Sequence, residues 1–462
     1  MTGRPNVIVL MTDDHATHAM SCYGSVINQT PHLDRLAAGG VRFTNAFCTN
    51  ALCAPSRASI LTGTYSHVNG VRTLDDNLDN RQTTFPSLLQ GAGYQTALVG
   101  KWHLGHGERH DPAGFDHWNV LPEQGVYDDP ELIENGTPTR RRGYVTDLLT
   151  DLALDRLDGR DPAKPFLLML HHKAPHSPWV PAPRHATLYE DDALPVPATF
   201  DDDHATRAEA IRIARIRIDS HLSAEELKQP VPTGLTWPEE RHWKYQRFVK
   251  DYLRCVAAVD ESVGRLLDWL DDAGLADDTI VVYTSDQGFF LGDHGWFDKR
   301  FMYEESLRMP LLVRYPREVP AGETRDAMVL NVDFAQTLLD YAGVPAPEGM
   351  QGRSFRAVCG RDQIDGWREA FYYRYWEHLS AINVCAHYGV RTKRHKLIYY
   401  YGEGLGTTGS SDRRMTPEWE LFDLAEDPCE LTNVYGDARY AQVREDLTAR
   451  LCDLKAEVGD LL

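Results

Sequence analysis

The run from Cys53 to Gly63, which reads CAPSRASILTG, has residue types and a spacing that suit covalent chemistry. Pro55 and Ser56 are typical of a helix start, so we expect Cys53 at the positive end of a helix. Arg57 follows one turn later on the same face, where its guanidinium can approach the side chain of residue 53. A nucleophile surrounded by such fixed positive charge would suit an anionic substrate.

A second group of residues has the donor atoms of a cation site. Asp13 and Asp14 follow one apolar run, and Asp286 and Gln287 follow another. If both runs are parallel strands of one sheet, their carboxyl ends meet at one edge and gather three carboxylates and an amide carbonyl. Hard divalent cations prefer such oxygen ligands, so the pattern predicts a metal site.

The apolar runs that precede these residues predict the elements that position them. They are short and continuous, which is typical of buried parallel strands, and they lie at 6–11, 96–99, 165–170, 279–283 and, less clearly, 311–313. Helical patterns fall between them, at 83–91, 146–157, 245–273 and 332–342. This alternation predicts an α/β fold with a large, mostly parallel sheet sandwiched by helices, whose charged strand ends, including Arg314 after the last run, converge on one edge.

The chain changes character after about residue 366. Aromatic-rich segments predict antiparallel strands, and a last periodic segment predicts a closing helix, at 371–376, 397–401 and 440–458. We therefore expect a catalytic domain over 1–365, with an irregular insertion at about 185–240. A smaller C-terminal α+β subdomain with a short antiparallel sheet would occupy 366–462.

Composition excludes several classes of function. The chain has 462 residues, with 48 Lys and Arg against 68 Asp and Glu, and a formal net charge of −20, which argues against nucleic acid as a partner. No apolar run approaches the roughly 20 residues of a spanning helix, so we expect no membrane partner. The start lacks the pattern of a signal peptide, which predicts a cytoplasmic location. The eight cysteines form no CxxC pair and are interpreted as reduced thiols.

Several motifs, in order along the whole chain, make this sequence resemble the type I sulfatases of the alkaline phosphatase-like superfamily. They are the Cys53–Gly63 run, Asp13-Asp14, Gly100-Lys101-Trp102-His103, Ala174-Pro175-His176, Ser285-Asp286-Gln287-Gly288 and Asp298-Lys299-Arg300. The resemblance implies a sulfuric ester hydrolase. It also implies that a formylglycine-generating enzyme oxidises Cys53 to formylglycine before folding, and that the hydrated aldehyde attacks sulfur.

The same resemblance implies roles for the other residues. Lys101 would contact the sulfate oxygens or the leaving-group bridge, and His103 would be the base that later releases sulfate. His176 and Lys299 would protonate or polarise the bridging oxygen. The cofactor implied is Ca²⁺, with Mg²⁺ less favoured, and its ligands would be the side chains of Asp13, Asp14, Asp286, Gln287 and residue 53. Many relatives carry Asn where this chain has Gln287, whose carbonyl reaches one methylene further.

The segment 285–305 is similar to bacterial sulfatases that act on sulfated sugars. The best substrate hypothesis is a small sulfated saccharide, with 6-O-sulfated N-acetylglucosamine first. Asp293 and His294 are predicted to bind sugar hydroxyls, although a turn stabilised by Asp293 explains them as well. A phosphonate monoester or phosphodiester hydrolase with the same modified cysteine remains the alternative enzyme, and a non-catalytic binding protein is a third interpretation.

Overall fold

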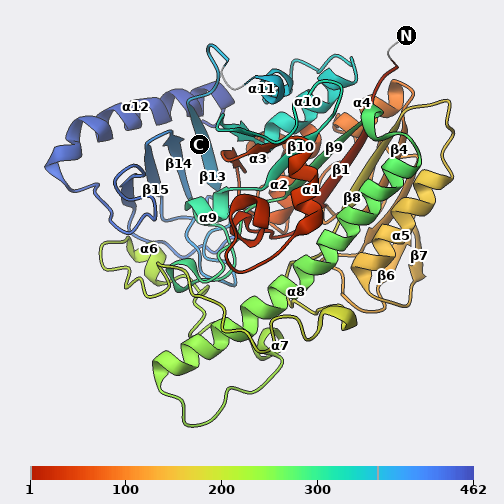
Figure 1. Ribbon diagram of the computed structural model, residues 1–462. Coiled ribbons are helices and arrows are strands. Elements are labelled where there is room, and N and C mark those ends of the chain that lie inside the picture. Colours follow the sequence, from red (N-terminus) through yellow and green to blue (C-terminus); the bar gives the residue numbers. More distant parts are fainter. Residues whose placement is uncertain (1–2, 362–363, 462) are drawn as a thin grey trace.

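A ten-stranded mixed sheet forms the centre of the computed structural model, which describes residues 3–361 and 364–461 (Figure 1). The outer limits of the predicted domains, residues 1 and 462, therefore lie outside the described residues. The strand order is β11-β2-β10-β9-β1-β8-β4-β5-β6-β7. The strands are β1 (Asn6–Thr12), β2 (Val41–Phe43), β4 (Gln95–Lys101), β5 (His117–Leu121), β6 (Glu131–Glu134), β7 (Thr137–Arg140), β8 (Phe166–His171), β9 (Thr279–Ser285), β10 (Leu311–Arg314) and β11 (Glu323–Arg325).

The middle of this sheet is parallel. β1 pairs in parallel with β8 and β9, and β4 pairs in parallel with β8 and β5. Val7 and Val9 of β1 pack in one hydrophobic core and Ile8 and Leu10 in another, as expected of a strand covered on both faces. The predicted mostly parallel α/β fold is confirmed.

The predicted strand at 311–313 exists as β10, but its direction differs from the expectation. β10 runs antiparallel to β9, pairing Leu312 with Tyr283. Its carboxyl end therefore points away from the ends of β1 and β9, and Arg314 does not join the predicted edge. A three-residue apolar run carries no information about strand direction, which depends on the connection that precedes it.

Helices cover both faces of the sheet. One face packs against α1 (Pro31–Ala38), α5 (Val145–Asp158) and α8 (Trp237–Asp272), and the other against α2 (Cys53–Thr62), α4 (Phe85–Gly91) and α10 (Phe334–Tyr341). Helix α8 begins eight residues before the predicted start because Thr236 and Glu239 form a capping box. Figure 1 shows the first turns of α8 projecting beyond the sheet beside α7 (Ala224–Leu227).

A four-stranded antiparallel sheet lies near the C-terminus, in the order β13-β14-β15-β16, with α12 (Ala441–Val458) against it (Figure 1). The strands are β13 (Ala370–Tyr375), β14 (His387–Thr392), β15 (His395–Tyr400) and β16 (Glu418–Asp423). The predicted antiparallel sheet and closing helix are confirmed. The rings of Phe47 and Phe371 stack with centroids 4.9 Å apart, so this sheet shares a core with the main sheet.

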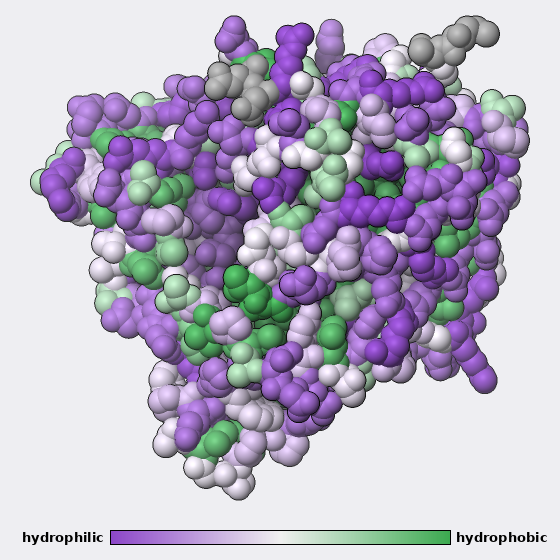
Figure 2. Space-filling view, in the orientation of Figure 1, coloured by the Kyte–Doolittle hydropathy of each residue, from purple (hydrophilic) through white to green (hydrophobic). Residues whose placement is uncertain are grey.

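The remaining elements are short. They are β3 (Ala46–Phe47), which pairs with β12 (Val329–Leu330), and the helices α3 (Ser66–Asn69), α6 (Glu209–Arg212), α9 (Glu304–Leu307) and α11 (Arg356–Gly360). The face seen in Figure 2 is mostly hydrophilic, with apolar residues gathered below its centre. Among the described residues, none of the helices combines the length and apolar composition that crossing a bilayer requires.

Candidate active site

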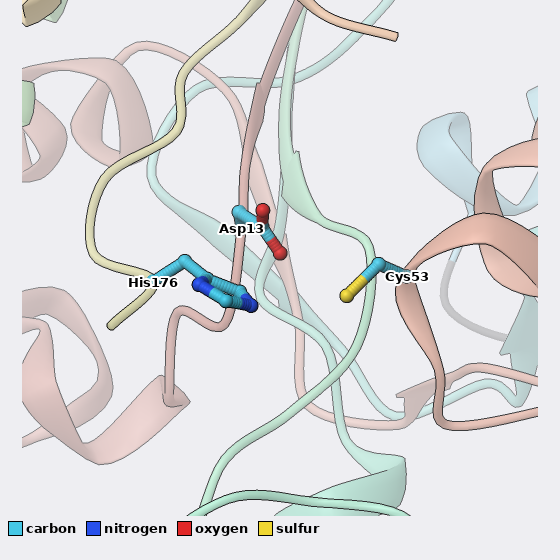
Figure 3. Close-up of side chains that lie close together, drawn as sticks. All are labelled: Asp13, Cys53 and His176. Carbon is cyan, nitrogen blue, oxygen red and sulfur yellow. The ribbon is translucent and has the colours of Figure 1, made fainter. Parts of the chain in front are cut away.

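A cavity of about 150 Å³ opens where β1 and β9 end and α2 begins, and four of the predicted site residues line it: Asp14, Cys53, His176 and Lys299. Figure 3 shows the side chains of Asp13, Cys53 and His176 directed toward one another, from just after β1, from the start of α2 and from the loop after β8. A carboxylate oxygen, the sulfur and a ring nitrogen of these three residues all lie within 4.8 Å of one another. Segments distant in sequence therefore meet at this point.

Cys53 is the first residue of α2, as predicted, and its side chain is buried. Burial raises the pKa of the Cys53 thiol to about 12, helped by the nearby Asp13 carboxylate and opposed by Lys299 and Lys101. The expected positive surroundings are present, but burial and Asp13 outweigh them. A thiol with such a pKa stays protonated near neutral pH and is a weak nucleophile, so the site gives no support to catalysis by the unmodified cysteine.

Arg57 lies one turn after Cys53 and is buried. Its Nε donates to Asp286 Oδ2 at 3.0 Å, and its Nη1 donates to the Lys101 carbonyl at 2.8 Å. Its Nη2 lies 2.8 Å from Asp286 Oδ2 as an ion pair. The guanidinium thus joins the start of α2 to the ends of β9 and β4. This charge-assisted contact to one carboxylate oxygen holds Asp286 against Arg57.

The three predicted carboxylate ligands lie together. One oxygen each of Asp13, Asp14 and Asp286 falls within 4.8 Å of the others, and all three residues are buried. Strand β1 ends at Thr12 and Asp14 has a φ of 69°, so the alternation of side chains stops before Asp14. Consecutive carboxylates can therefore face the same site.

Gln287 joins this group, since its Nε2 donates to Asp14 Oδ1. Gln287 Oε1 and Asp13 Oδ1 are buried and have no hydrogen-bond partner among the described residues. Unpartnered buried oxygens are costly, and two of them beside two further carboxylates are the donor set of a hard cation. The residues present therefore fit a divalent metal ion.

The electrostatics of the carboxylates point the same way. Burial raises the pKa of Asp14 to about 7, although Lys299 opposes the shift, and burial raises the pKa of Asp286 to about 6. Burial also works against ionised Asp13, but Lys101 and its cationic neighbours prevail and hold the pKa of Asp13 well below its usual range. Two of the three carboxylates keep raised pKa values although lysine and arginine side chains lie beside them. The three carboxylates could therefore accept a further positive charge.

Lys101 and His103 both lie near the cavity. β4 ends at Lys101, and His103 has a φ of 56°, so the segment between them is not extended. Gln124, which sequence reasoning missed, bridges them: its Oε1 lies 2.5 Å from Lys101 Nζ and its Nε2 lies 3.2 Å from His103 Nε2. Lys101 Nζ also donates to Asp13 Oδ2.

Lys299 and His176 both approach Asp14. Lys299 Nζ lies 2.7 Å from Asp14 Oδ2, and His176 Nε2 lies 3.7 Å from the same oxygen. His176 Nδ1 is 2.8 Å from the Ser177 carbonyl, which only accepts, so Nδ1 carries the proton. Burial, then the charge of Lys101, hold the pKa of His176 well below its usual range. Lys299 is therefore the protonated member of the pair, and His176 is neutral with Nε2 free to accept.

The structure does not bring Asp293 and His294 to the cavity lining. His294 is fully buried, with Nδ1 at 2.8 Å from Asp202 Oδ2, and its contact with a sugar hydroxyl stays a prediction. Asp293 accepts from the Leu291 amide at 3.1 Å, as expected if its side chain stabilises the turn. Its carboxylate also lies 3.1 Å from His18 Nε2. The loop that carries Asp293 and His294 packs against the insertion through Asp202. The sequence around the loop does not indicate this contact.

Other residues complete the cavity wall, among them Trp179, Glu226 and Arg300. Arg300 Nη1 donates to Glu377 Oε1 at 3.0 Å and to the Tyr375 hydroxyl at 3.2 Å. Tyr375 ends β13, so the C-terminal sheet reaches the cavity. The third residue of the Asp298-Lys299-Arg300 motif was the available signal for Arg300.

Comparison with known proteins gives consistent results. A sequence model of the Sulfatase family matches residues 5–344, and one described as N-sulphoglucosamine sulphohydrolase, C-terminal, matches 292–457. The chain is 44% identical to N-acetylglucosamine-6-O-sulfatase from Bacteroides thetaiotaomicron, over 99% of this chain and 88% of that protein. It is 31% identical to human N-acetylglucosamine-6-sulfatase over 74% of this chain and 62% of that protein.

Solved structures extend the comparison. A protein solved in complex with its substrate D-glucosamine-2-N,6-O-disulfate superposes with a TM-score of 0.92 and 43% identity, covering 99% of both chains. The phosphonate monoester hydrolase of Agrobacterium radiobacter has a TM-score of 0.77 at 23% identity, over 98% of this chain and 96% of that one. The second likeness extends to the fold alone.

Proposed function

The chain belongs to the sulfatase family of sulfuric ester hydrolases, and we propose that it removes the 6-O-sulfate of a small glucosamine saccharide, with N-acetylglucosamine 6-sulfate first among substrates. The observation that carries this proposal is a group of seven residues at and beside one small cavity. They are Cys53, the carboxylates Asp13, Asp14 and Asp286, and the buried cationic side chains Arg57, Lys101 and Lys299. Such a site neutralises both an attacking oxygen and an anionic ester, which would otherwise repel each other.

The cofactors follow from the same residues. We propose that Cys53 is converted to formylglycine by a formylglycine-generating enzyme, which supplies a hydrated aldehyde as the nucleophile. Asp13, Asp14, Asp286 and Gln287 would hold Ca²⁺, which would supply charge neutralisation at the sulfate. The unpartnered Asp13 Oδ1 and Gln287 Oε1 support a cation at this position.

The chain's own residues then perform the remaining tasks. Lys101 and Lys299 place ammonium groups beside Cys53, where they can bind sulfate oxygens, and Lys299 holds a proton for the leaving sugar oxygen. A sugar alkoxide is a poor leaving group, so help by a general acid is worth about 10²–10⁴-fold. Trp179, Phe289 and Phe297 line the cavity and exclude water from the reacting group.

The size of the cavity supports a small substrate. A volume of about 150 Å³ is below the roughly 300–1,000 Å³ usual for a drug-sized ligand, so it suits one sulfated sugar end. The names of the 44% identical relative and of the 0.92 TM-score neighbour support a 6-O-sulfated glucosamine unit. We therefore expect action at a terminal sugar, and equal turnover of an intact polymer would contradict this.

The test is sulfate release from a panel of small substrates. The panel holds N-acetylglucosamine 6-sulfate, N-sulfoglucosamine, galactose 6-sulfate, an aryl sulfate and an aryl phosphonate, assayed with enzyme carrying the aldehyde at residue 53. We expect preferred turnover of N-acetylglucosamine 6-sulfate. Cleavage of the phosphonate alone would contradict the proposal and favour the alternative hydrolase.

A further inference from the structure

Gln124 lies where it contacts two predicted catalytic side chains at once, although no sequence motif includes it. β4 and β5 are parallel neighbours, and Lys101 pairs with Leu121 in their register. The chain then turns, with the Gly125 amide donating to the Pro122 carbonyl at 2.8 Å. This turn sends Gln124 back toward the end of β4, and Gln124 also lines the cavity.

The orientation of the Gln124 amide is fixed by its neighbours. The Lys101 ammonium lies 2.5 Å from Oε1, and an ammonium only donates. Turning the amide over would set two donors against each other, so Oε1 must face Lys101 and Nε2 must face His103. The amide nitrogen also only donates, so His103 Nε2, at 3.2 Å, must accept.

We propose that Gln124 is a positioning residue that holds Lys101 and His103 as a pair and sets the proton of neutral His103 on Nδ1. His103 Nδ1 is buried and has no partner in the part of the chain that the structure describes. The nitrogen left for a reacting oxygen is thus an N–H donor, so in this tautomer His103 stabilises that oxygen by donating to it and is not the base that the family resemblance implies. Of the three Lys101 N–H groups, Asp13 and Gln124 take two, and none of the described residues takes the third. That N–H is available to a sulfate oxygen.

This inference rests on the proposed function in assigning Lys101 and His103 to the reacting sulfate, but the tautomer can be measured without substrate. The probe is protein with ¹⁵N-labelled imidazole rings, in both the wild type and the C53A variant, which needs no aldehyde. The His103 signals are identified as those absent from an H103Q variant. We expect a proton on Nδ1 and none on Nε2.

Two variants of similar size separate the hydrogen bonds from the packing. In Gln124→Glu the carboxylate accepts from Lys101 and from His103, so the proton moves to Nε2. Gln124→Met removes both contacts, and we expect kcat to fall about 10- to 100-fold while KM stays within about threefold, as for supporting residues elsewhere. Gln442→Met, on the exposed face of α12, is the matched control and leaves both readouts unchanged.

Thermal unfolding of each variant confirms that it is folded before the comparison is made. A proton on Nε2 in the wild type, or an unchanged tautomer in Gln124→Glu, would overturn the inference. Loss of sulfate release by every preparation, with the expected tautomer in C53A, would instead contradict the proposed function and leave the role of Gln124 standing.

Discussion

Two clusters of buried charge in this molecule use the same residue types for different ends. The active-site cluster consists of Asp13, Asp14, Arg57, Lys101, Asp286 and Lys299. The subdomain cluster consists of Glu304, Arg308, Arg391, Lys396 and Glu430, and it joins α9 to β14 and β15. In the subdomain cluster Lys396 Nζ lies 3.0 Å from Glu304 Oε1 and 2.5 Å from Glu430 Oε1.

The difference lies in what the charges leave unsatisfied. The active-site cluster borders the cavity and includes the unpartnered Asp13 Oδ1, with unpartnered Gln287 Oε1 beside it. The subdomain cluster also holds two atoms without a hydrogen-bond partner, Lys396 Nζ and Glu430 Oε1, but these lie 2.5 Å apart as an ion pair. Its other carboxylate, Glu304, contacts Arg308, Arg391 and Lys396. Burial of charge therefore does not by itself identify a reactive site. Unpartnered carboxylate and amide oxygens grouped beside a cavity do.

The largest effect is expected at the nucleophile of the active-site cluster. Cys53→Ala removes the group that is oxidised, so sulfate release should fall by at least about 10⁴-fold while the fold is kept. Cys53→Ser should also be poor, since a serine sulfate has no second hydroxyl to expel the sulfate. Turnover and circular dichroism check this, and residual turnover within tenfold of the parent would refute the assignment of Cys53.

The next largest effects come from replacing one lysine of each cluster by methionine, which should lower stability in one cluster and kcat in the other. Lys396→Met leaves Glu304 and Glu430 partly unpaired in a buried site, so the free energy of unfolding should fall by about 3–5 kcal/mol. The kcat of the folded fraction should stay within about threefold. Lys101→Met should instead lower kcat by about 10²–10³-fold. Denaturant unfolding and turnover measure both, and a large loss of kcat in Lys396→Met would contradict the division.

Added Ca²⁺ should stabilise the protein by binding at the active-site cluster and not at the subdomain cluster. Ca²⁺ at about 100 times its Kd should raise the free energy of unfolding by about 2.7 kcal/mol, and Asp14→Asn should remove most of this gain. Burial raises the pKa of Asp14 to about 7 and that of Asp286 to about 6, so protons compete with the cation at low pH. The stabilisation should therefore be greatest above pH 7 and decline as the pH falls through 6.

Calorimetry with and without Ca²⁺ at several pH values measures this effect. The same calorimetry on Lys396→Met is the control, because no metal ion is proposed to bind at the subdomain cluster. A gain from Ca²⁺ that survives in Asp14→Asn would place the cation elsewhere.

The smallest effect is expected where the charges are exposed. Arg35 on α1 contacts Asp268 and Asp271 on α8 at 2.5 and 2.7 Å, all in solvent. Arg35→Ala should change the free energy of unfolding by less than about 1 kcal/mol, because water screens such pairs. Urea unfolding checks the value. A loss comparable to that of Lys396→Met would mean that burial does not separate these ion pairs.

Sequence reasoning recovered what is local or repeated along the chain. The strands that end just before Asp13 and Asp286, the helix starting at Cys53 and the C-terminal sheet were predicted because each has its own pattern. The motifs also named six side chains that the structure gathers at the cavity or at the ligand cluster beside it: Asp13, Asp14, Cys53, His176, Asp286 and Lys299.

The rest depends on contacts between distant segments. Gln124 reaches Lys101 only because β4 and β5 are parallel neighbours, and the sequence of β5, the strand before it, gave no clear pattern. His294 was placed at the sugar because its loop lies between motifs, but Asp202 of the insertion pairs with it and buries it. The turn after Lys101 depends on the left-handed backbone of His103, which its residue type does not indicate.

The central claim is that the active-site cluster acts through a converted Cys53, and one titration tests it most directly. Preparations with different degrees of conversion are made, the aldehyde at residue 53 is quantified by peptide mass, and the rate of sulfate release from N-acetylglucosamine 6-sulfate is measured for each. We predict a rate proportional to the aldehyde fraction, with a line through zero. Equal rates in preparations with and without the aldehyde would contradict the account.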